Sequence, residues 1–276
     1  MSALATTPIH DSTPLDRAGQ LLAGRIALPV MPDLARQIIE SALDDFVHYD
    51  ALAGIAEQDP VLTARLLGVA NSAYFASPMQ VTSVRGAIGR VGLDLVRGLM
   101  VGMVMDNLFD ASACPAFNHR RFWSDGLATA YCARKLSESG THSDKATLIG
   151  TAALLQSIGI LTAVCVSPHD MNRVLSANTS VSEGVLRSLG CTQAQLRDQL
   201  LEQWNLPADL RRLLGDEQTT DVEFIYLCTA SALVLDRPLS ADDIDALATA
   251  LNSAGIAADV ELLQELSTIS FEDLHL

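Results

Sequence analysis

Residues 58–75 read QDPVLTARLLGVANSAYF and contain a helix together with its start and its end. Asp59 can accept hydrogen bonds from the first free N–H groups of this helix. Pro60 loses nothing at the first helical position, because it has no N–H to leave unpaired. One face of the helix is apolar at helical spacing, through Leu62, Leu66 and Val69. The stretch therefore predicts a capped helix that ends near Asn71.

The same helical period continues on both sides of this stretch, and no sustained alternation of β-branched and polar residues appears. The sequence therefore predicts an all-α fold. Gly92 is expected to stop a short helix, and Asp94 to cap the next one, which carries a wide apolar stripe. The expected helices cover residues 32–39, a helix from about 49, 60–70, 83–91, 94–109, 121–139, 144–166, 171–175, 182–189, 192–204, 207–214, 222–235, a helix from 240, and 260–266.

Composition and charge exclude several classes of protein. Hydrophobic residues make up 49% of the 276 residues and charged residues 18%, which predicts a sizeable core and excludes a disordered chain. The formal net charge of −15 opposes binding to DNA or RNA through bulk electrostatics. With only 5% aromatic residues, the chain also offers few stacking surfaces for single-stranded nucleic acid. We expect no nucleic-acid partner.

The cysteines and the most apolar segment bear on the cellular compartment. The five cysteines are widely separated with no CxxC, which excludes a disulfide framework and a zinc knuckle and fits a reducing cytosol. The N-terminal residues lack the pattern of a secretory signal. Residues 146–168 carry no charge and are long enough to span a bilayer, but interrupting polar and glycine residues favour a buried central helix over a membrane span. We therefore expect a cytoplasmic protein without a membrane span.

Several short motifs, in this order, resemble the bacterial HDOD domain. Each is weak alone, but their combination is specific and covers roughly residues 22–235. The motifs are LPVMP at 28–32, QDPVLTARLL at 58–67, ANSAYF at 70–75, AIGRVG at 87–92, FWSD at 122–125, AALLQSIG at 152–159 and LEQWNLP at 201–207. The resemblance implies an all-α fold related to the HD phosphohydrolases and a place among signalling and regulatory proteins. The lobes expected from it are an N-terminal helical bundle at 16–110 and an HD-like lobe at 117–276, after a flexible N-terminus at 1–15.

The resemblance also identifies positions where HD enzymes bind metal with histidines and aspartates. At these positions the chain has Asp125, Gln156, Ser157 and Ser231. One carboxylate with neutral neighbours is a poor site for a divalent ion, which needs charged oxygens and imidazoles to offset its dehydration. We therefore expect no metal, no cofactor and no hydrolase activity. None of the six histidines lies within helical reach of another, and we expect those at the ends of elements, His48, His119, His142 and His169, to be solvated or capping residues.

Two further features have a structural and a functional interpretation. Asn71 and Ser72 follow an apolar helix and are interpreted as a structural corner, formed by a left-handed Asn or a Ser bonded to a terminal carbonyl, with ligand contact as the alternative. Residues 61–135 carry a net charge of +4, whereas the rest of the chain carries −19. Its arginines are either scattered solvated residues or a shared anion-binding face. The residues that could bind a partner are Arg85, Arg90, Arg97, Arg120 and Arg121.

The sequence thus predicts a non-catalytic signalling protein that acts by binding a protein partner. The expected partner is a response regulator, a cyclase or phosphodiesterase, or a kinase, in a pathway linked to cyclic-dinucleotide or two-component signalling. The alternative is a residual metal-dependent phosphohydrolase or a nucleotide-binding sensor that uses the +4 segment as a phosphate cradle.

Overall fold

The computed structural model of this chain is built from helices, and every regular element in the described residues is helical, so the predicted all-α class is confirmed. The structure describes residues 29–44, 46–75, 79–140, 143–177, 180–215, 222–235, 238–257 and 259–272. The N-terminus predicted to be flexible, residues 1–15, lies outside them.

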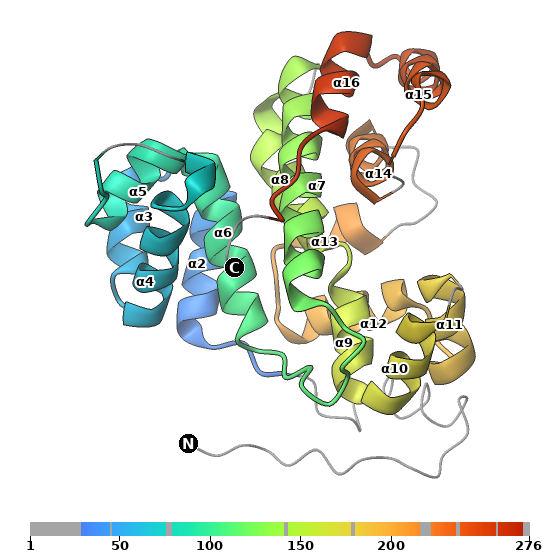
Figure 1. The fold of residues 1–276 in the computed structure, drawn as a ribbon, viewed down its shortest axis with the longest axis horizontal. Coiled ribbons are helices and arrows are strands. Elements are labelled where there is room, and N and C mark those ends of the chain that lie inside the picture. The colour runs from blue at the N-terminus through green and yellow to red at the C-terminus, as the bar shows by residue number, and fades with distance from the viewer. Residues whose placement is uncertain are drawn as a thin grey trace. The chain divides into compact units, whose positions relative to one another are not determined.

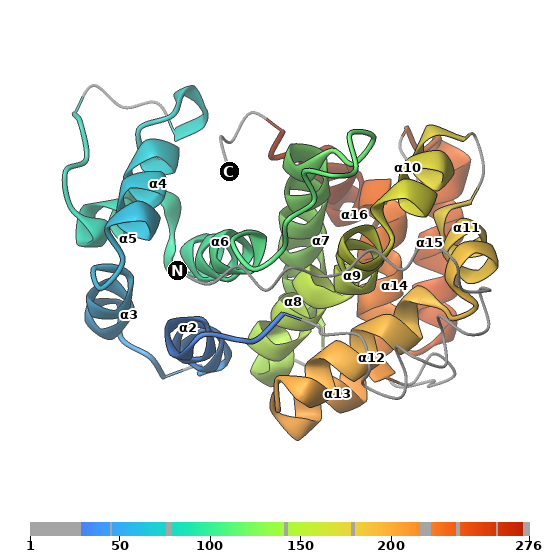
Figure 2. The same ribbon diagram turned by 90° about the horizontal axis from the view of Figure 1, so that it is seen from below.

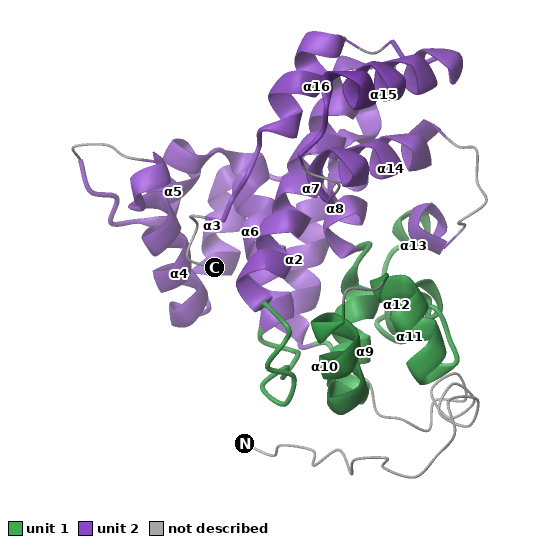
Figure 3. Ribbon diagram, turned by 45° about the vertical axis from the view of Figure 1, so that its right-hand side comes forward, with its two compact units in different colours: residues 1–31, 107–118, 156–211 green, residues 32–106, 119–155, 212–276 purple. Residues whose placement is uncertain are grey.

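Two compact units divide the chain, and each is assembled from separate stretches of sequence (Figure 3). Unit 1 contains the described parts of residues 1–31, 107–118 and 156–211. Unit 2 contains the described parts of residues 32–106, 119–155 and 212–276. The lobes predicted from the sequence were continuous, whereas each of these units is discontinuous.

The first segment of unit 2 is a group of short helices around α6 (Figure 1). α6 packs against α2, which Figure 2 shows from below, and α5 packs against α3 and α4. Asp59 accepts from the backbone N–H groups of Val61 and Leu62, at 2.8 and 3.2 Å, as the sequence predicts. Gly92 ends α5 with a φ of 94°. These elements are α2 (Asp33–Leu43), α3 (Tyr49–Ala56), α4 (Pro60–Ala70), the 3₁₀ helix η1 (Ala73–Phe75), α5 (Val84–Val91) and α6 (Leu93–Asp106).

The remainder of unit 2 is organised by the long helix α7, which packs against α6, α8 and α14. Its core includes Ile149 and Tyr226, neither of which has exposed surface. Ser240 begins α15 with a capping box to Asp243, as its sequence predicts. The elements are α7 (His119–Ser139), η2 (Ser143–Lys145), α8 (Ala146–Leu155), α14 (Val222–Leu235), α15 (Ala241–Ser253) and α16 (Val260–Ser267).

Unit 1 is built on the packing of α12 against α9. Trp204, 1% exposed, directly follows α12; its Nε1 donates to the carbonyl of Pro29 at 2.7 Å, and its ring lies 6.0 Å from that of Phe109. It is therefore a core residue. The helices are α9 (Ile158–Val166), α10 (Pro168–Ser176), α11 (Val181–Leu189) and α12 (Gln193–Gln203), followed by α13 (Ala208–Gly215), whose residues divide between unit 1 and unit 2.

The apolar stretch predicted as one helix over 144–166 is two helices, and that prediction is wrong. α8 ends at Leu155 and α9 begins at Ile158, with Gln156 and Ser157 in a turn between them. By length and composition alone, the stretch from Ser143 to Val166 could cross a membrane, with a mean hydropathy of 1.9 in its most apolar window. However, 67% of that window is buried inside the fold, which is typical of core helices.

Candidate functional site

The four HD-type positions lie on three elements and carry a single charge. Asp125, on α7, has one carboxylate oxygen 3.4 Å from Nε of Arg121, one helical turn earlier. Gln156 and Ser157 form the turn between α8 and α9 and belong to unit 1. Ser231, on α14 in unit 2, donates its hydroxyl to the carbonyl of Leu227 at 2.8 Å. The three neutral residues therefore take part in local structure: Gln156 and Ser157 in a turn, and Ser231 in a hydrogen bond within its own helix.

This set of donors does not fit a catalytic metal. A divalent ion that activates water needs several anionic or imidazole ligands, whereas these four positions supply one carboxylate, already paired with an arginine, one amide and two hydroxyl groups. Within the described residues, no group of three or more His, Cys, Asp or Glu side chains comes together to hold a metal. Of the histidines, His48 precedes α3, and Nδ1 of His119 lies 3.0 Å from a carboxylate oxygen of Asp106.

Asn71 organises the corner after α4. Its side-chain amide donates to the carbonyls of Leu67 and Val81, at 2.9 and 2.8 Å, and its side-chain oxygen accepts from the N–H of Val81 at 2.8 Å. Its φ of −99° is not left-handed, so the side chain makes the corner rather than an unusual backbone conformation. The buried hydroxyl of Ser72 has no hydrogen-bond partner in the described chain, so the predicted bond to a terminal carbonyl is not formed.

Arg90 reaches the same corner from α5. Its guanidinium donates to the carbonyl of Ala70 and to the side-chain oxygen of Asn71, both at 3.2 Å, and to the carbonyl of Met79. The structure therefore brings together Asn71 and Arg90, two residues that the sequence assigned to separate roles. The Arg90 guanidinium therefore stabilises the corner through these hydrogen bonds, and only part of the half-buried side chain is accessible to an external partner.

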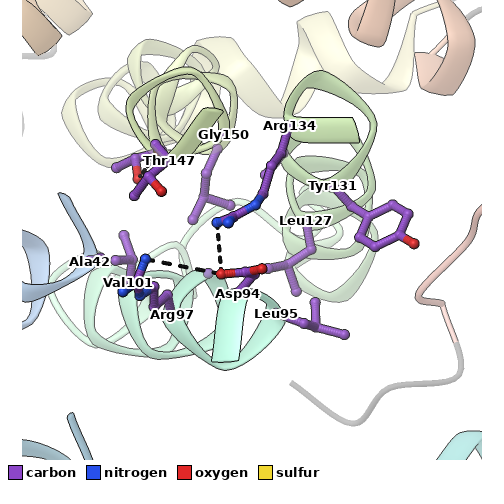
Figure 4. Close-up of a pocket in the computed structure, with 14 residues that line it drawn as sticks. Ala42, Asp94, Leu95, Arg97, Val101, Leu127, Tyr131, Arg134, Thr147 and Gly150 are labelled. Carbon is purple, nitrogen blue, oxygen red and sulfur yellow. Dashed lines mark hydrogen bonds and ion pairs between the residues drawn. The ribbon is translucent and has the colours of Figure 1, made fainter. Parts of the chain in front are cut away.

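A pocket in unit 2 lies where α6 faces α7 and α8, and Arg97, Asp94 and Arg134 carry its charges (Figure 4). One oxygen of Asp94 lies 2.8 Å from Arg134 and 4.0 Å from Arg97, so one carboxylate lies between two guanidinium groups. Arg97 is 4% exposed and also donates to the carbonyl of Asp44 at 3.0 Å. Asp94 lies inside the first turn of α6, which begins at Leu93, so the prediction that it caps the helix is wrong.

A second carboxylate completes this charge cluster. Glu138 accepts from Arg134 and Lys135, both at 2.8 Å. Partial burial alone would raise the pKa of Glu138, but the hydrogen bonds from Lys135 and Arg134 outweigh it and hold that pKa below its ordinary value. Because Arg134 thus has two acidic partners, the pocket carries little net charge. The cluster joins α6 to α7 by ion pairs.

The size and lining of the pocket limit its chemistry. Its cavity volume is about 50 Å³, which is room for about one or two water molecules. Threonine hydroxyls and the Tyr131 ring share the wall with apolar residues, and the described lining contains no His, Cys or Lys. The charged side chains of the lining, Asp94, Arg97 and Arg134, lie in ion pairs with one another, which is a structural role.

The five arginines predicted to bind a partner differ in exposure. Arg97 is buried, and it does not belong on a partner-binding surface because its guanidinium is directed into the α6–α7 ion-pair cluster. Arg85 and Arg121 are 63% and 69% exposed at the side chain and pair with Asp50 and Asp125, respectively. Arg120 is exposed and has no ion-pair partner in the described part of the chain. The surface candidates are thus Arg85, Arg120 and Arg121.

Sequence reasoning missed two of the arrangements in unit 2. The pair Asp94–Arg134 joins residues 40 positions apart, and no local spacing signals it. Phe271, beyond the last predicted helix, is only 2% exposed, although no helical period around it indicates a core position. The one available signal was a lone aromatic residue in a polar C-terminal stretch.

Every regular element in the described residues is a helix, so the class is an all-α helical domain. The family model of the HDOD domain matches residues 28–219, which is more than half of the chain. The chain therefore belongs to the HDOD domain family, as its motifs predict. No relative was found among curated protein sequences.

Solved structures show the same fold. An HDOD domain protein of unknown function from Geobacter sulfurreducens is 18% identical with a TM-score of 0.66, over 92% of this chain and 97% of that one. A protein from Shewanella amazonensis SB2B named as a phosphohydrolase is 20% identical with a TM-score of 0.68, over 96% and 97%. A protein from Marinobacter aquaeolei VT8 named as a signal transduction protein is 22% identical with a TM-score of 0.69, over 92% of this chain and 62% of its own length. At these identities the likeness shows the fold alone.

Proposed function

We propose that this chain is a non-catalytic regulatory protein that acts by binding a protein partner in a signal-transduction pathway. The observation that carries the proposal is the donor set at the HD-type positions. Only Asp125 among the four is charged, and its carboxylate is paired with Arg121 at 3.4 Å. Without a set of anionic ligands, the ancestral route to hydrolysis is lost while the helical fold is kept, so fold and chemistry have separated.

Membership in the HDOD family and the name of the Marinobacter relative support a signalling role. The partner classes that suit this role are a response regulator, a cyclase or phosphodiesterase, or a kinase. The net charge of −15 argues against a nucleic-acid partner, and the burial of the long apolar stretch at residues 143–166 supports a protein without a membrane span. A cytoplasmic location and the lack of a cofactor are part of this proposal.

The exposed arginines at the start of α7 suit the binding of an acidic surface. Arg120 is exposed with no ion-pair partner in the described residues, and Arg121, 69% exposed, forms a solvent-accessible pair with Asp125. Charges at the edge of an interface mainly raise the association rate, and salt screens their effect. We therefore expect partner association that slows as ionic strength rises.

The test compares three double variants of the full chain for association with the partner captured from the source organism. Arg120→Glu with Arg121→Glu should lower the association rate by about tenfold or more at low salt, with a smaller difference at high salt. Gln156→Ala with Ser157→Ala should leave association nearly unchanged. Arg173→Glu with Arg187→Glu makes the same change in net charge at exposed positions of unit 1 and serves as the matched control.

The opposite pattern would contradict the proposal. If the Gln156 and Ser157 variant abolished association in a folded protein while the Arg120 and Arg121 reversals did nothing, the HD-type positions would be the working site. The alternative function, a residual phosphohydrolase or a nucleotide-binding sensor, would then replace the proposed one. The name of the Shewanella relative is the observation that favours this alternative.

A further inference from the structure

The described residues after α16, 268–272, form a short non-helical segment with one buried side chain. α16 ends at Ser267, and the segment that follows runs alongside α7 (Figure 1). Leu263 and Leu266 hold α16 itself in the core. Beyond the helix, Phe271 is 2% exposed, whereas Ser270 and Glu272 on either side of it are exposed. A single aromatic side chain therefore anchors this segment, which we call the C-terminal strap (residues 268–272).

The anchor lies between aromatic rings from two distant parts of unit 2. The Phe271 ring is 5.8 Å from Tyr74 of η1, at an interplanar angle of 59°, and 6.2 Å from Tyr131 of α7, at 84°. The ring of Phe75 packs edge-on against Tyr74 at 4.9 Å. These are the separations and angles that aromatic pairs prefer. We call Tyr74, Phe75 and Tyr131 the aromatic cup.

The strap is held by this side chain and not by its backbone. In the described chain, residues 268–272 make hydrogen bonds only within 265–272, such as those from the N–H groups of Thr268 and Ile269 to α16 and from Glu272 to the Ser270 hydroxyl. No backbone ladder or ion pair in the described residues joins the strap to η1 or α7. Release of Phe271 would therefore free the strap without breaking a hydrogen bond or an ion pair to the cup.

The cup also remains partly accessible with the strap in place. Tyr74 is 46% exposed, a large value for an aromatic side chain that contacts two other rings. It lies directly after the corner that Asn71 and Arg90 stabilise, so hydrogen bonds hold the chain at the base of the cup. An aromatic-lined and partly exposed site occupied by a short peptide segment is the geometry by which many domains recognise peptides.

We infer that the aromatic cup is a binding site for a short protein segment that presents an aromatic side chain, and that the C-terminal strap occupies it in cis as a competitor. The strap itself shows the chemistry of the ligand, since Phe271 already fills the cup. The inference rests on the proposed function in one respect, that the chain acts through a protein partner. It adds a second surface, distinct from Arg120 and Arg121, and a way to regulate access to it.

Tethering determines how strongly the strap competes. A segment attached close to its site has an effective concentration on the order of 1 mM. If the strap sequence as a free peptide binds the open cup with a dissociation constant of about 100 µM, the tethered strap would weaken the binding of any external segment about tenfold. Removal of the strap should raise the affinity for an external segment by that factor, without any change in the cup.

The experiment uses a fluorescein-labelled peptide of residues 267–276, STISFEDLHL, as the probe and measures fluorescence anisotropy. Three proteins are compared: the full chain, a chain that stops after Ile269, and full-length Phe271→Ala. The shortened chain and Phe271→Ala should bind the peptide with similar affinity, and the full chain at least about tenfold more weakly. A peptide with Phe271→Ala should not bind, and Tyr74→Ala in the shortened chain should abolish binding.

Several outcomes would overturn the inference. One is failure of the folded shortened chain to bind the peptide, and another is equal binding by the shortened and full chains. If circular dichroism shows that neither the shortened chain nor Phe271→Ala folds, Phe271 is an ordinary core residue and the cup is no binding site. If the full chain forms a dimer that the shortened chain does not, the strap fills the cup of a second copy and the cis arrangement is wrong. None of these outcomes depends on the Arg120 and Arg121 test.

Discussion

Asn71 connects two backbone segments through one side chain, and this determines what its replacement would cost. It bonds to the last turn of α4 through Leu67 and to the extended residue Val81 through both donor and acceptor. Arg90 adds a bond to the same side-chain oxygen. The corner therefore depends on an amide with a donor and an acceptor in fixed positions, which neither Asp nor Ser supplies.

We predict that Asn71→Ala lowers the free energy of unfolding by about 1–2 kcal/mol, because three hydrogen bonds to backbone groups are lost. Ser72→Ala is the matched control. The buried Ser72 hydroxyl has no partner in the described chain, so its removal should be neutral within about 0.5 kcal/mol or slightly stabilising. Urea denaturation of both variants measures the difference. Equal destabilisation by the two would contradict the role assigned to Asn71.

The arginines show where reasoning from single residues fails. Residue type and spacing placed Arg97 on a surface, because arginine is usually exposed. In the fold it is buried, where its guanidinium donates to the Asp44 carbonyl at 3.0 Å and lies 4.0 Å from the Asp94 carboxylate. Arg134, the other basic residue of that cluster, comes from a helix that lies next to α6 only after folding. A sequence displays which charges are present but not which of them neutralise one another.

At the scale of elements, local chemistry predicts helix ends well. Asp59 with Pro60 and Ser240 begin helices as predicted, since their capping bonds span only two or three residues. Thr192 begins α12 with the same kind of bond, in a capping box with Gln195. The turn at Gln156 and Ser157 was not predicted. An apolar run has no periodicity to mark an interruption, and Ser157 forms no side-chain cap that could have revealed the start of α9.

Gly159 governs the closest approach between two helices of unit 1. A Cβ at this position of α9 would lie 1.9 Å from the carbonyl oxygen of Gln193 and 3.2 Å from the backbone nitrogen of Arg197 on α12. Both atoms belong to backbone, so no side-chain rotation can relieve the overlap. α9 and α12 would have to separate along their contact, and the cost of such overpacking is typically about 1–3 kcal/mol or more.

We therefore predict that Gly159→Ala destabilises the protein by about 2 kcal/mol or more, seen as a lower midpoint in chemical denaturation. The same chemical change at Gly89, Gly89→Ala, should have the opposite effect on stability and serves as the control. Gly89 lies within α5, and an added methyl group would meet no described atom within 4 Å, so alanine should stabilise that helix by roughly 0.5–1 kcal/mol. A neutral result at Gly159 would show that α9 and α12 can separate freely.

For the whole molecule, the family and fold class were predictable and the spatial division was not. The order of the motifs along the chain predicts the family, and the helical period of the apolar residues predicts the fold class. No local sequence pattern predicts which distant segments assemble together. Residues 107–118 and 156–211 join one unit only through contacts made when the chain folds. The same reason explains why the aromatic cup was missed, since Tyr74 and Tyr131 meet only around Phe271.

The side chains at the HD-type positions lead to a prediction about the metal content of the purified protein. We expect well below one equivalent of iron, manganese or zinc after gel filtration, because the HD-type positions supply one carboxylate among neutral groups. Elemental analysis by mass spectrometry measures this, with the buffer as the blank and Asp125→Ala as a comparison. About one equivalent in the unaltered chain that is lost in Asp125→Ala would contradict the prediction and support the hydrolase alternative.

The interleaving of the two units also sets the order of events during synthesis. Unit 1 lacks its last segment until residue 211 has left the ribosome, and unit 2 lacks its third segment until after that. The helices of residues 32–106 must therefore wait, with apolar faces uncovered, while most of the chain is still being made. A premature stop or a proteolytic cut before residue 211 leaves both units incomplete, so shortened products of this chain should be substrates for chaperones and proteases rather than half-active proteins.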